Sequence, residues 1–245
     1  MNESIEDITS EEKINPPEQI VVYTVRHGNT NYIGTKRDLT KEGEQQVIKT
    51  ANELAEKIDK DKDIVIVVES PTKRTQYTGK IIREVLESKG IEVFKERGFY
   101  SIRDRIKDPN KFLDKYTKRG MEKGDLEGTV KSLGQLEFRS YKDKRPEETY
   151  EEMYERTQSA IIKLVKVASS MDWEGKKPVI IMAGHALTSR GIVRKAGLTE
   201  NGLDSDISHA SCVKLEFRRG NPEVKVSFHE EEGTIRLNGN EFLEN

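Results

Sequence analysis

Cysteine is almost absent from this sequence, which has only Cys212 among its 245 residues. A single thiol excludes an internal disulfide framework and a zinc site built on several cysteines. No apolar run is as long as a membrane span, and residues 1–19 lack the apolar stretch of a secretory signal peptide. We therefore expect a cytoplasmic protein that does not bind membranes.

The sequence also lacks an excess of charge of either sign. Its formal net charge is −2, although charged residues make up 35% of the chain. This balance gives no reason to expect nucleic acid as a partner. Hydrophobic residues make up only 33%, but they gather in short runs such as 20–25 and 64–68. That clustering favours a folded core beneath a highly charged surface over a disordered chain.

The order of the apolar runs predicts one α/β domain. Residues 1–17 are polar and end in two prolines, so we expect a disordered tail before a domain at 18–245. Weak periodicity and several glycines at about 100–145 predict an insertion. We expect this insertion to lie over the functional site. Strands are expected at 19–25, 63–68, 91–94, 177–182, 211–217 and 224–229, the last two as a hairpin, and helices at 40–58, 70–88, 146–169 and from 185 to about 196. Their alternation predicts a mainly parallel sheet with helices on both faces.

Histidine and arginine side chains stand where three of the predicted buried strands end. Arg26 and His27 follow the first strand, Arg74 follows the second, and His185 follows a later one. Ligands bind at the carboxyl ends of strands in open α/β sheets, so these side chains should converge. Arginine matches two phosphate oxygens, and a neutral imidazole can act as a nucleophile. Each residue alone could be structural, but together they predict a pocket for a phosphate dianion.

The stretches around these residues resemble those of the histidine phosphatase superfamily, the phosphoglycerate-mutase-like enzymes with an R-H-G motif. The matching stretches, in the order that the family has them, are 25–30, 39–43, 70–75 and 183–185. The resemblance implies a three-layer α/β/α sandwich with a mostly parallel central sheet. It also implies that His27 becomes phosphorylated while Arg26, Arg74 and His185 hold the phosphoryl group, with Asn29 as a further polar contact. No metal or other cofactor is implied.

The general acid is also assigned by the resemblance. A leaving alkoxide needs a proton, so a carboxylic acid should lie near the nucleophile. The family supplies a glutamate just after the third strand, and Glu96 holds that position. Asp104 and Glu122 are the alternatives, and the competing interpretation of Glu96 is one more solvated carboxylate, which we favour less. The remaining histidines, His209 and His229, lie in or beside the late hairpin and are interpreted as structural or exposed.

Three functions fit this sequence. The first is a phosphatase that acts on a small phosphorylated substrate through a phosphohistidine. The second is a phosphoglycerate mutase, whose typical E-R-H-Y-G segment is matched here only by Glu96 and Arg97 of residues 96–100. The third is a binding protein without turnover, which the presence of all four core histidine and arginine residues disfavours. The sequence leaves both the substrate and the oligomeric state open.

Overall fold

The computed structural model describes residues 17–30, 38–69, 72–94, 150–171, 173–198 and 207–236. Most of the predicted tail and the whole predicted insertion at 100–145 therefore lie outside the described residues. The elements are β1 (Gln19–Arg26), α1 (Lys41–Ala55), β2 (Asp63–Glu69), α2 (Lys73–Ser88), α6 (Tyr150–Ser169), β3 (Lys177–Gly184), α7 (Ala186–Lys195), β4 (Cys212–Arg218), β5 (Glu223–Phe228) and β6 (Glu231–Arg236).

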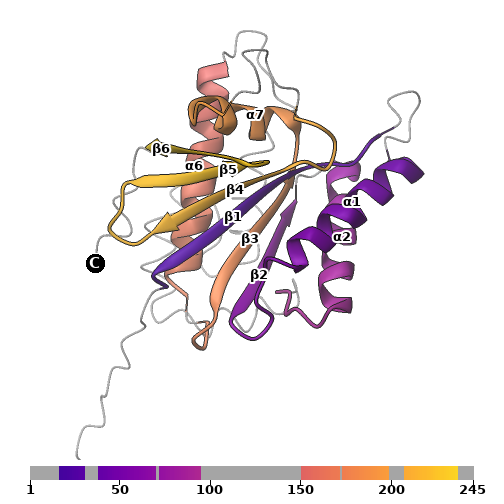
Figure 1. Ribbon diagram of the computed structural model, residues 1–245, viewed down its shortest axis with the longest axis horizontal. Coiled ribbons are helices and arrows are strands. Elements are labelled where there is room, and N and C mark those ends of the chain that lie inside the picture. The colour runs from indigo at the N-terminus through magenta and orange to yellow at the C-terminus, as the bar shows by residue number, and fades with distance from the viewer. Residues whose placement is uncertain are drawn as a thin grey trace, which may run out of the picture.

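Within these residues, six strands form one sheet in the order β2-β3-β1-β4-β5-β6. The first three strands are parallel to one another, and each remaining strand is antiparallel to its neighbour. Helices α1 and α2 cover one face of the sheet and α6 and α7 the other (Figure 1). The predicted α/β sandwich is confirmed. The sheet is mixed because β4 of the late hairpin pairs with β1 in antiparallel direction, and a third strand, β6, extends the hairpin.

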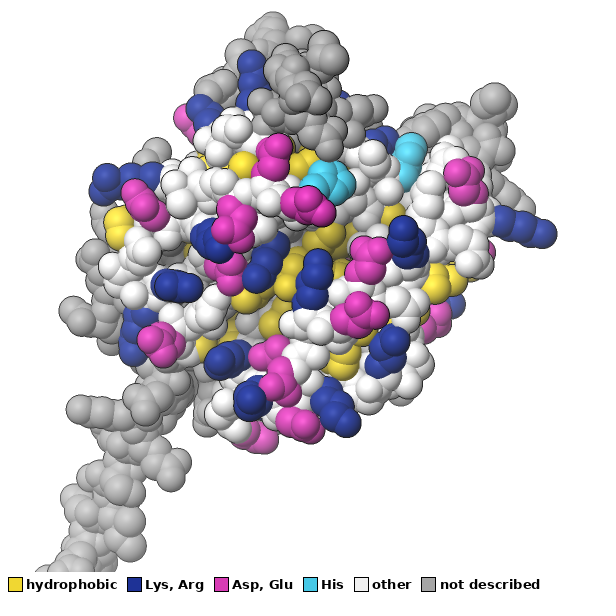
Figure 2. All heavy atoms as spheres, in the orientation of Figure 1, with side chains coloured by type: hydrophobic (Ala, Val, Ile, Leu, Met, Phe, Trp, Pro, Cys, Tyr) yellow, Lys and Arg dark blue, Asp and Glu magenta, His cyan; other side chains and the backbone are white. Residues whose placement is uncertain are grey.

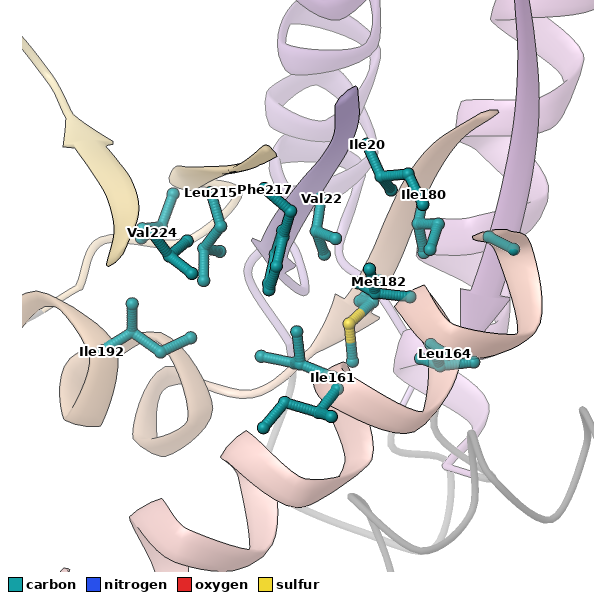
Figure 3. Close-up of a cluster of buried hydrophobic side chains, with 14 of the residues drawn as sticks. Ile20, Val22, Ile161, Leu164, Ile180, Met182, Ile192, Leu215, Phe217 and Val224 are labelled. Atoms are coloured by element: carbon teal, nitrogen blue, oxygen red, sulfur yellow. The ribbon is translucent and has the colours of Figure 1, made fainter. Parts of the chain in front are cut away.

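The core beneath α6 and α7 is the larger of two apolar clusters. Alternate residues of β1, β3 and β4 point to this side and meet α6 and α7 (Figure 3). The buried side chains include Ile20, Val22, Ile180, Met182, Leu215, Phe217, Ile161 and Ile192. The intervening residues of the same strands face the other way because strand side chains alternate between faces. A single strand such as β1 or β3 therefore contributes side chains to the apolar clusters on both faces of the sheet.

The second core lies between the parallel strands and α1 and α2. Val47, Ala51 and Leu54 recur at helical spacing on α1 and are buried against the sheet. Thr40 caps this helix, since the Gly43 amide donates to Thr40 Oγ1 at 3.0 Å. Helix α2 begins at Lys73, three residues later than predicted. The predicted strand at 91–94 makes only an isolated parallel bridge, between Val65 and Val93.

Helices α1 and α2 cover the parallel half of the sheet, and the same face of β4, β5 and β6 carries charged side chains. Two ion pairs lie there, Lys214–Glu216 at 3.0 Å and Lys225–Glu232 at 2.7 Å. Figure 2 shows acidic and basic side chains interspersed over this side of the molecule. The mixture agrees with the balanced composition. No helix among the described residues is long and apolar enough to cross a membrane.

Candidate active site

The turn that follows β1 is held by the chain on both sides. The His27 amide donates to the Gly184 carbonyl at the end of β3, at 3.0 Å. On the other side, the Arg26 amide donates to the Ser211 carbonyl at 3.0 Å, and the Ala210 amide donates to the His27 carbonyl at 3.3 Å. The two residues are therefore fixed between β3 and the segment that leads into β4.

A close approach between two glycines brings this turn against the start of α1. A Cβ atom on Gly28 would lie 2.3 Å from the Gly43 carbonyl oxygen, and one on Gly43 would lie 2.1 Å from the Asn29 carbonyl oxygen. Both contacts are with main-chain atoms, which cannot rotate away. Glycine normally weakens a helix, but at Gly43 the missing side chain is what lets the turn approach.

The imidazole of His27 is oriented by its own turn. Its Nδ1 lies 2.8 Å from the Gly28 carbonyl oxygen, which can only accept, so Nδ1 carries the proton. Thr30 Oγ1 lies 3.2 Å from the same nitrogen and donates to the same carbonyl at 3.0 Å. His27 as a whole is 3% exposed. In this tautomer Nε2 keeps its lone pair, as a nucleophile requires.

Arg74 and His185 meet although they come from different strand ends. Arg74 lies in the first turn of α2, and His185 is the N-cap residue of α7. Arg74 Nη2 lies 3.4 Å from His185 Nδ1, and both residues are buried. A guanidinium only donates, so His185 accepts at Nδ1 and carries its proton on Nε2. The His185 ring also lies edge-on to His27, with 5.4 Å between centroids.

A third histidine, His209, belongs to the same cluster. Its Nε2 lies 3.1 Å from Arg26 Nη2, and its ring centroid is 5.7 Å from that of His27. The sequence interpretation of His209 as structural or exposed did not place it here. The missed signal is topological: β4 is antiparallel to β1, with Cys212 opposite Val25, so residues just before β4 lie beside the end of β1.

The electrostatics of the cluster favour an anion over a cation. Burial lowers the pKa of His27 to about 4; its Nδ1 hydrogen bond opposes this effect, and the positive charges of Arg74 and Arg26 add to it. Burial, then the charge of Arg74, lower the pKa of His185 to about 3. Both imidazoles are therefore neutral at pH 7. Among the described residues, no group of three or more histidine, cysteine, aspartate or glutamate residues could hold a metal ion.

Comparison with known protein families decides which family has this arrangement. The model of the histidine phosphatase superfamily (branch 1) matches residues 22–229. The chain belongs to the histidine phosphatase superfamily. The matched range includes every site residue predicted from the sequence, from Arg26 to His185. No curated protein sequence matches the chain significantly.

Solved structures similar to this superfamily member include enzymes of more than one activity. A phosphoglycerate mutase from Bacillus anthracis str. Sterne superimposes with a TM-score of 0.50 at 14% identity, covering 92% of this chain and 96% of that one. A mycobacterial glucosyl-3-phosphoglycerate phosphatase has a TM-score of 0.45 at 15% identity, covering 85% and 96%. At 14% identity the likeness to the mutase shows the fold alone and leaves the specific activity unresolved.

The residues predicted for this superfamily site divide into three groups. Arg26, His27, Arg74 and His185 come together as expected. Asn29 follows the motif directly, but its side-chain amide donates to Glu42 on α1 at 3.1 Å, so its contact with phosphate stays a prediction. Glu96, Asp104 and Glu122 lie outside the described residues.

Proposed function

We propose that the chain is a metal-independent phosphatase that hydrolyses phosphate monoesters through a phosphohistidine on His27. The observation that carries this proposal is the tautomer of that residue. Its Nδ1 proton is held by the Gly28 carbonyl at 2.8 Å, and its Nε2 is left with a lone pair. Its lowered pKa keeps the ring neutral, and therefore nucleophilic, near pH 7.

In the first step, Nε2 of His27 attacks the phosphorus atom of the ester. A P–N bond forms while the P–O bond to the leaving group breaks. The leaving alkoxide takes a proton, which we assign to the carboxylic acid of Glu96. The products are the phosphorylated histidine and a free alcohol.

In the second step, water hydrolyses the phosphohistidine. The Glu96 carboxylate removes a proton from the water as its oxygen attacks phosphorus, and the P–N bond breaks. Inorganic phosphate leaves, while His27 and the acid return to their starting protonation states. Each turnover consumes one water molecule and needs no redox partner.

Stabilisation of the transferring group is assigned to Arg26, Arg74 and His185. Phosphoryl transfer depends mainly on positioning and on neutralising charge on the phosphoryl oxygens. Two guanidiniums supply positive charge at the His27 ring, where both lower its pKa. Since His185 accepts from Arg74 at Nδ1, its proton lies on Nε2, and we assign that N–H group to a phosphoryl oxygen. Arg74 lies in the first turn of α2 and His185 is the N-cap residue of α7, and helix N-termini favour anions.

Hydrolysis is favoured over the mutase reaction by the segment that follows the proposed acid. A phosphoglycerate mutase grips its carboxylated substrate with E-R-H-Y-G, whereas this chain has Glu96-Arg97-Gly98-Phe99-Tyr100. We therefore propose small phosphate esters as substrates.

The test is phosphate release from p-nitrophenyl phosphate in EDTA, with wild type compared with His27→Gln. Phosphate bound to the protein is trapped in parallel. Its loss in acid would identify it as phosphohistidine. We expect wild-type turnover that falls by at least about 10³-fold in the variant, the loss that follows removal of a nucleophile. His229→Asn is the matched control, because His229 lies in the β5–β6 turn with φ 53°, a backbone that asparagine tolerates.

The outcomes separate the candidate functions. Phosphate trapped on wild type but not on His27→Gln would support the proposal. Turnover that requires a metal, or that survives in the variant, would contradict it. A folded wild type that releases no phosphate but interconverts phosphoglycerates would be a mutase instead.

A further inference from the structure

The segment just before β4 contacts both terminal nitrogens of the Arg26 guanidinium. Nη1 donates to the Ile207 carbonyl, and Nη2 lies 3.1 Å from His209 Nε2. Arg26 is the last residue of β1, directly before the proposed nucleophile. Contacts at two nitrogens fix both the position and the plane of a guanidinium. Residues 207–209 thus determine how Arg26 presents its remaining donors.

The protonation state of His209 follows from its partner. A guanidinium has donors only, so Nε2 of His209 must accept, and the proton of a neutral ring is on Nδ1. A doubly protonated ring would have no acceptor for Arg26. It would also add a positive charge next to Arg26 and 5.7 Å from the His27 ring centroid. The geometry therefore requires a neutral His209.

The main chain around His209 is fixed as firmly as its ring. Ala210 has φ 60°, a left-handed conformation that a residue with a side chain seldom adopts. Its amide donates to the His27 carbonyl at 3.3 Å, and its carbonyl accepts from Thr50 Oγ1 at 2.9 Å. The unusual backbone is thus held by β1 on one side and by α1 on the other. Such local strain is often found at functional sites.

We infer that His209 is a positioning residue, whose neutral imidazole orients the Arg26 guanidinium toward the phosphoryl group. The inference rests on the proposed function in that the anion held by Arg26 is the transferring phosphoryl group. His209 acts through Arg26 and takes no part in forming or breaking bonds.

The experiment compares two substitutions of similar size. His209→Gln keeps an acceptor, because the glutamine amide oxygen reaches as far as Nε2, whereas His209→Leu removes it. Binding of inorganic phosphate is measured by isothermal titration calorimetry, and hydrolysis of p-nitrophenyl phosphate is measured in parallel. We expect His209→Leu to weaken phosphate binding about 10- to 100-fold, as for the loss of a hydrogen bond to a charged group. His209→Gln should stay within about 3-fold of wild type on the same scale.

A double-mutant cycle tests whether the effect passes through Arg26. In an Arg26→Lys background the ammonium cannot make the paired contacts, so His209→Leu should change kcat/KM less than about 2-fold. Circular dichroism and Tm verify that each variant folds, and His229→Asn again serves as the control for loss of a histidine. The inference would be overturned if His209→Gln and His209→Leu weakened phosphate binding equally. It would also be overturned if His209→Leu bound phosphate within 2-fold of wild type.

Calorimetry keeps this test separate from that of the proposed function. If wild type binds phosphate but forms no phosphohistidine, the proposed function fails. The comparison of His209→Gln with His209→Leu then still decides the role of His209. If wild type binds no phosphate, both are overturned.

Discussion

Arg74 Nη2 lies 3.4 Å from His185 Nδ1, although 111 residues separate them in the chain. Each follows a buried parallel strand, and β2 and β3 are neighbours in the sheet. The strand ends therefore bring the two side chains together, and the arginine selects the tautomer of the histidine. A change at Arg74 should thus alter both a positive charge and a hydrogen-bond donor in the proposed phosphate site.

Arg74→Lys should reduce kcat/KM about 10- to 100-fold. Lysine keeps the charge, but its ammonium cannot both reach phosphate and hold His185 in the way a planar guanidinium does. Steady-state kinetics with p-nitrophenyl phosphate measure the loss. Arg83→Lys is the control, since Arg83 lies on the same helix and pairs with Glu69 instead. A similar fall in both variants would point to damage to α2 rather than to the site.

Gly43→Ala should destabilise the protein by about 1–3 kcal/mol, as overpacking of a close contact does. The sign is the reverse of what helix propensity predicts, which favours alanine over glycine by about 1 kcal/mol. The reason is the Asn29 carbonyl oxygen, 2.1 Å from the new Cβ. Urea unfolding of the purified variant measures the change in the free energy of unfolding.

Gly191→Ala is the matched control for that substitution. Gly191 lies within α7, and its new Cβ would meet a side-chain atom, Tyr154 Cδ2, at 3.3 Å. The tyrosine ring can shift by a few tenths of an ångström, so the free energy of unfolding should be unchanged or higher. Destabilisation of both variants to the same degree would contradict the importance of the turn contact.

The free energy of unfolding should fall on acidification as the two buried histidines protonate in the unfolded chain. Their pKa values are lowered from 6.5 to about 4 for His27 and about 3 for His185. The unfolded state therefore binds more protons below about pH 6.5, and folding loses at most about 1.4 kcal/mol per pH unit for each histidine. The loss should continue down to about pH 4 for His27 and about pH 3 for His185.

Denaturant unfolding of wild type and His185→Gln between pH 7 and pH 4.5, in phosphate-free buffer, isolates this effect. Subtracting the two curves removes the titration of the many surface carboxylates. The free energy of unfolding of wild type, relative to that of the variant, should fall toward acid, because only wild type has the lowered pKa of His185. Parallel curves would show that His185 titrates alike in both states.

Glu96→Gln tests the proposed acid. The variant should slow hydrolysis of alkyl phosphates roughly 10²–10⁴-fold, the range for general acid catalysis. It should slow p-nitrophenyl phosphate much less, because that leaving group departs without protonation. Matched substrates are compared on one enzyme preparation by phosphate release. The assignment to Glu96 would be excluded by equal losses on both substrates, and Asp104→Asn and Glu122→Gln would then be assayed in the same way.

Sequence patterns predicted those parts of the fold and site that depend on local chemistry. Buried strands are recognisable as β-branched runs, and a parallel strand's carboxyl end marks where a polar residue will face a ligand. That rule found Arg26, His27, Arg74 and His185 from their positions alone. The family match over residues 22–229 confirms the predicted superfamily, while the roles of these four residues stay predictions.

What the sequence could not predict depends on strand pairing over long separations. His209 enters the site because β4 joins β1 in antiparallel register, and nothing within the hairpin indicates that pairing. Strand β6 was not predicted because Glu231–Arg236 has a single buried apolar residue, Ile235. The role of Gly43 was equally hidden, since a close approach is a property of two segments and not of one.

The hydrogen bonds that hold the turn after β1 have a consequence for the exchange of amide protons with solvent. The amides of Arg26 and His27 donate to carbonyls on opposite sides, at Ser211 and Gly184. Freeing either proton requires the sheet to separate beside β1, so both should exchange at the rate of global unfolding. The proposed nucleophile would then lie on the slowest-exchanging backbone of the protein, already rigid before any substrate binds.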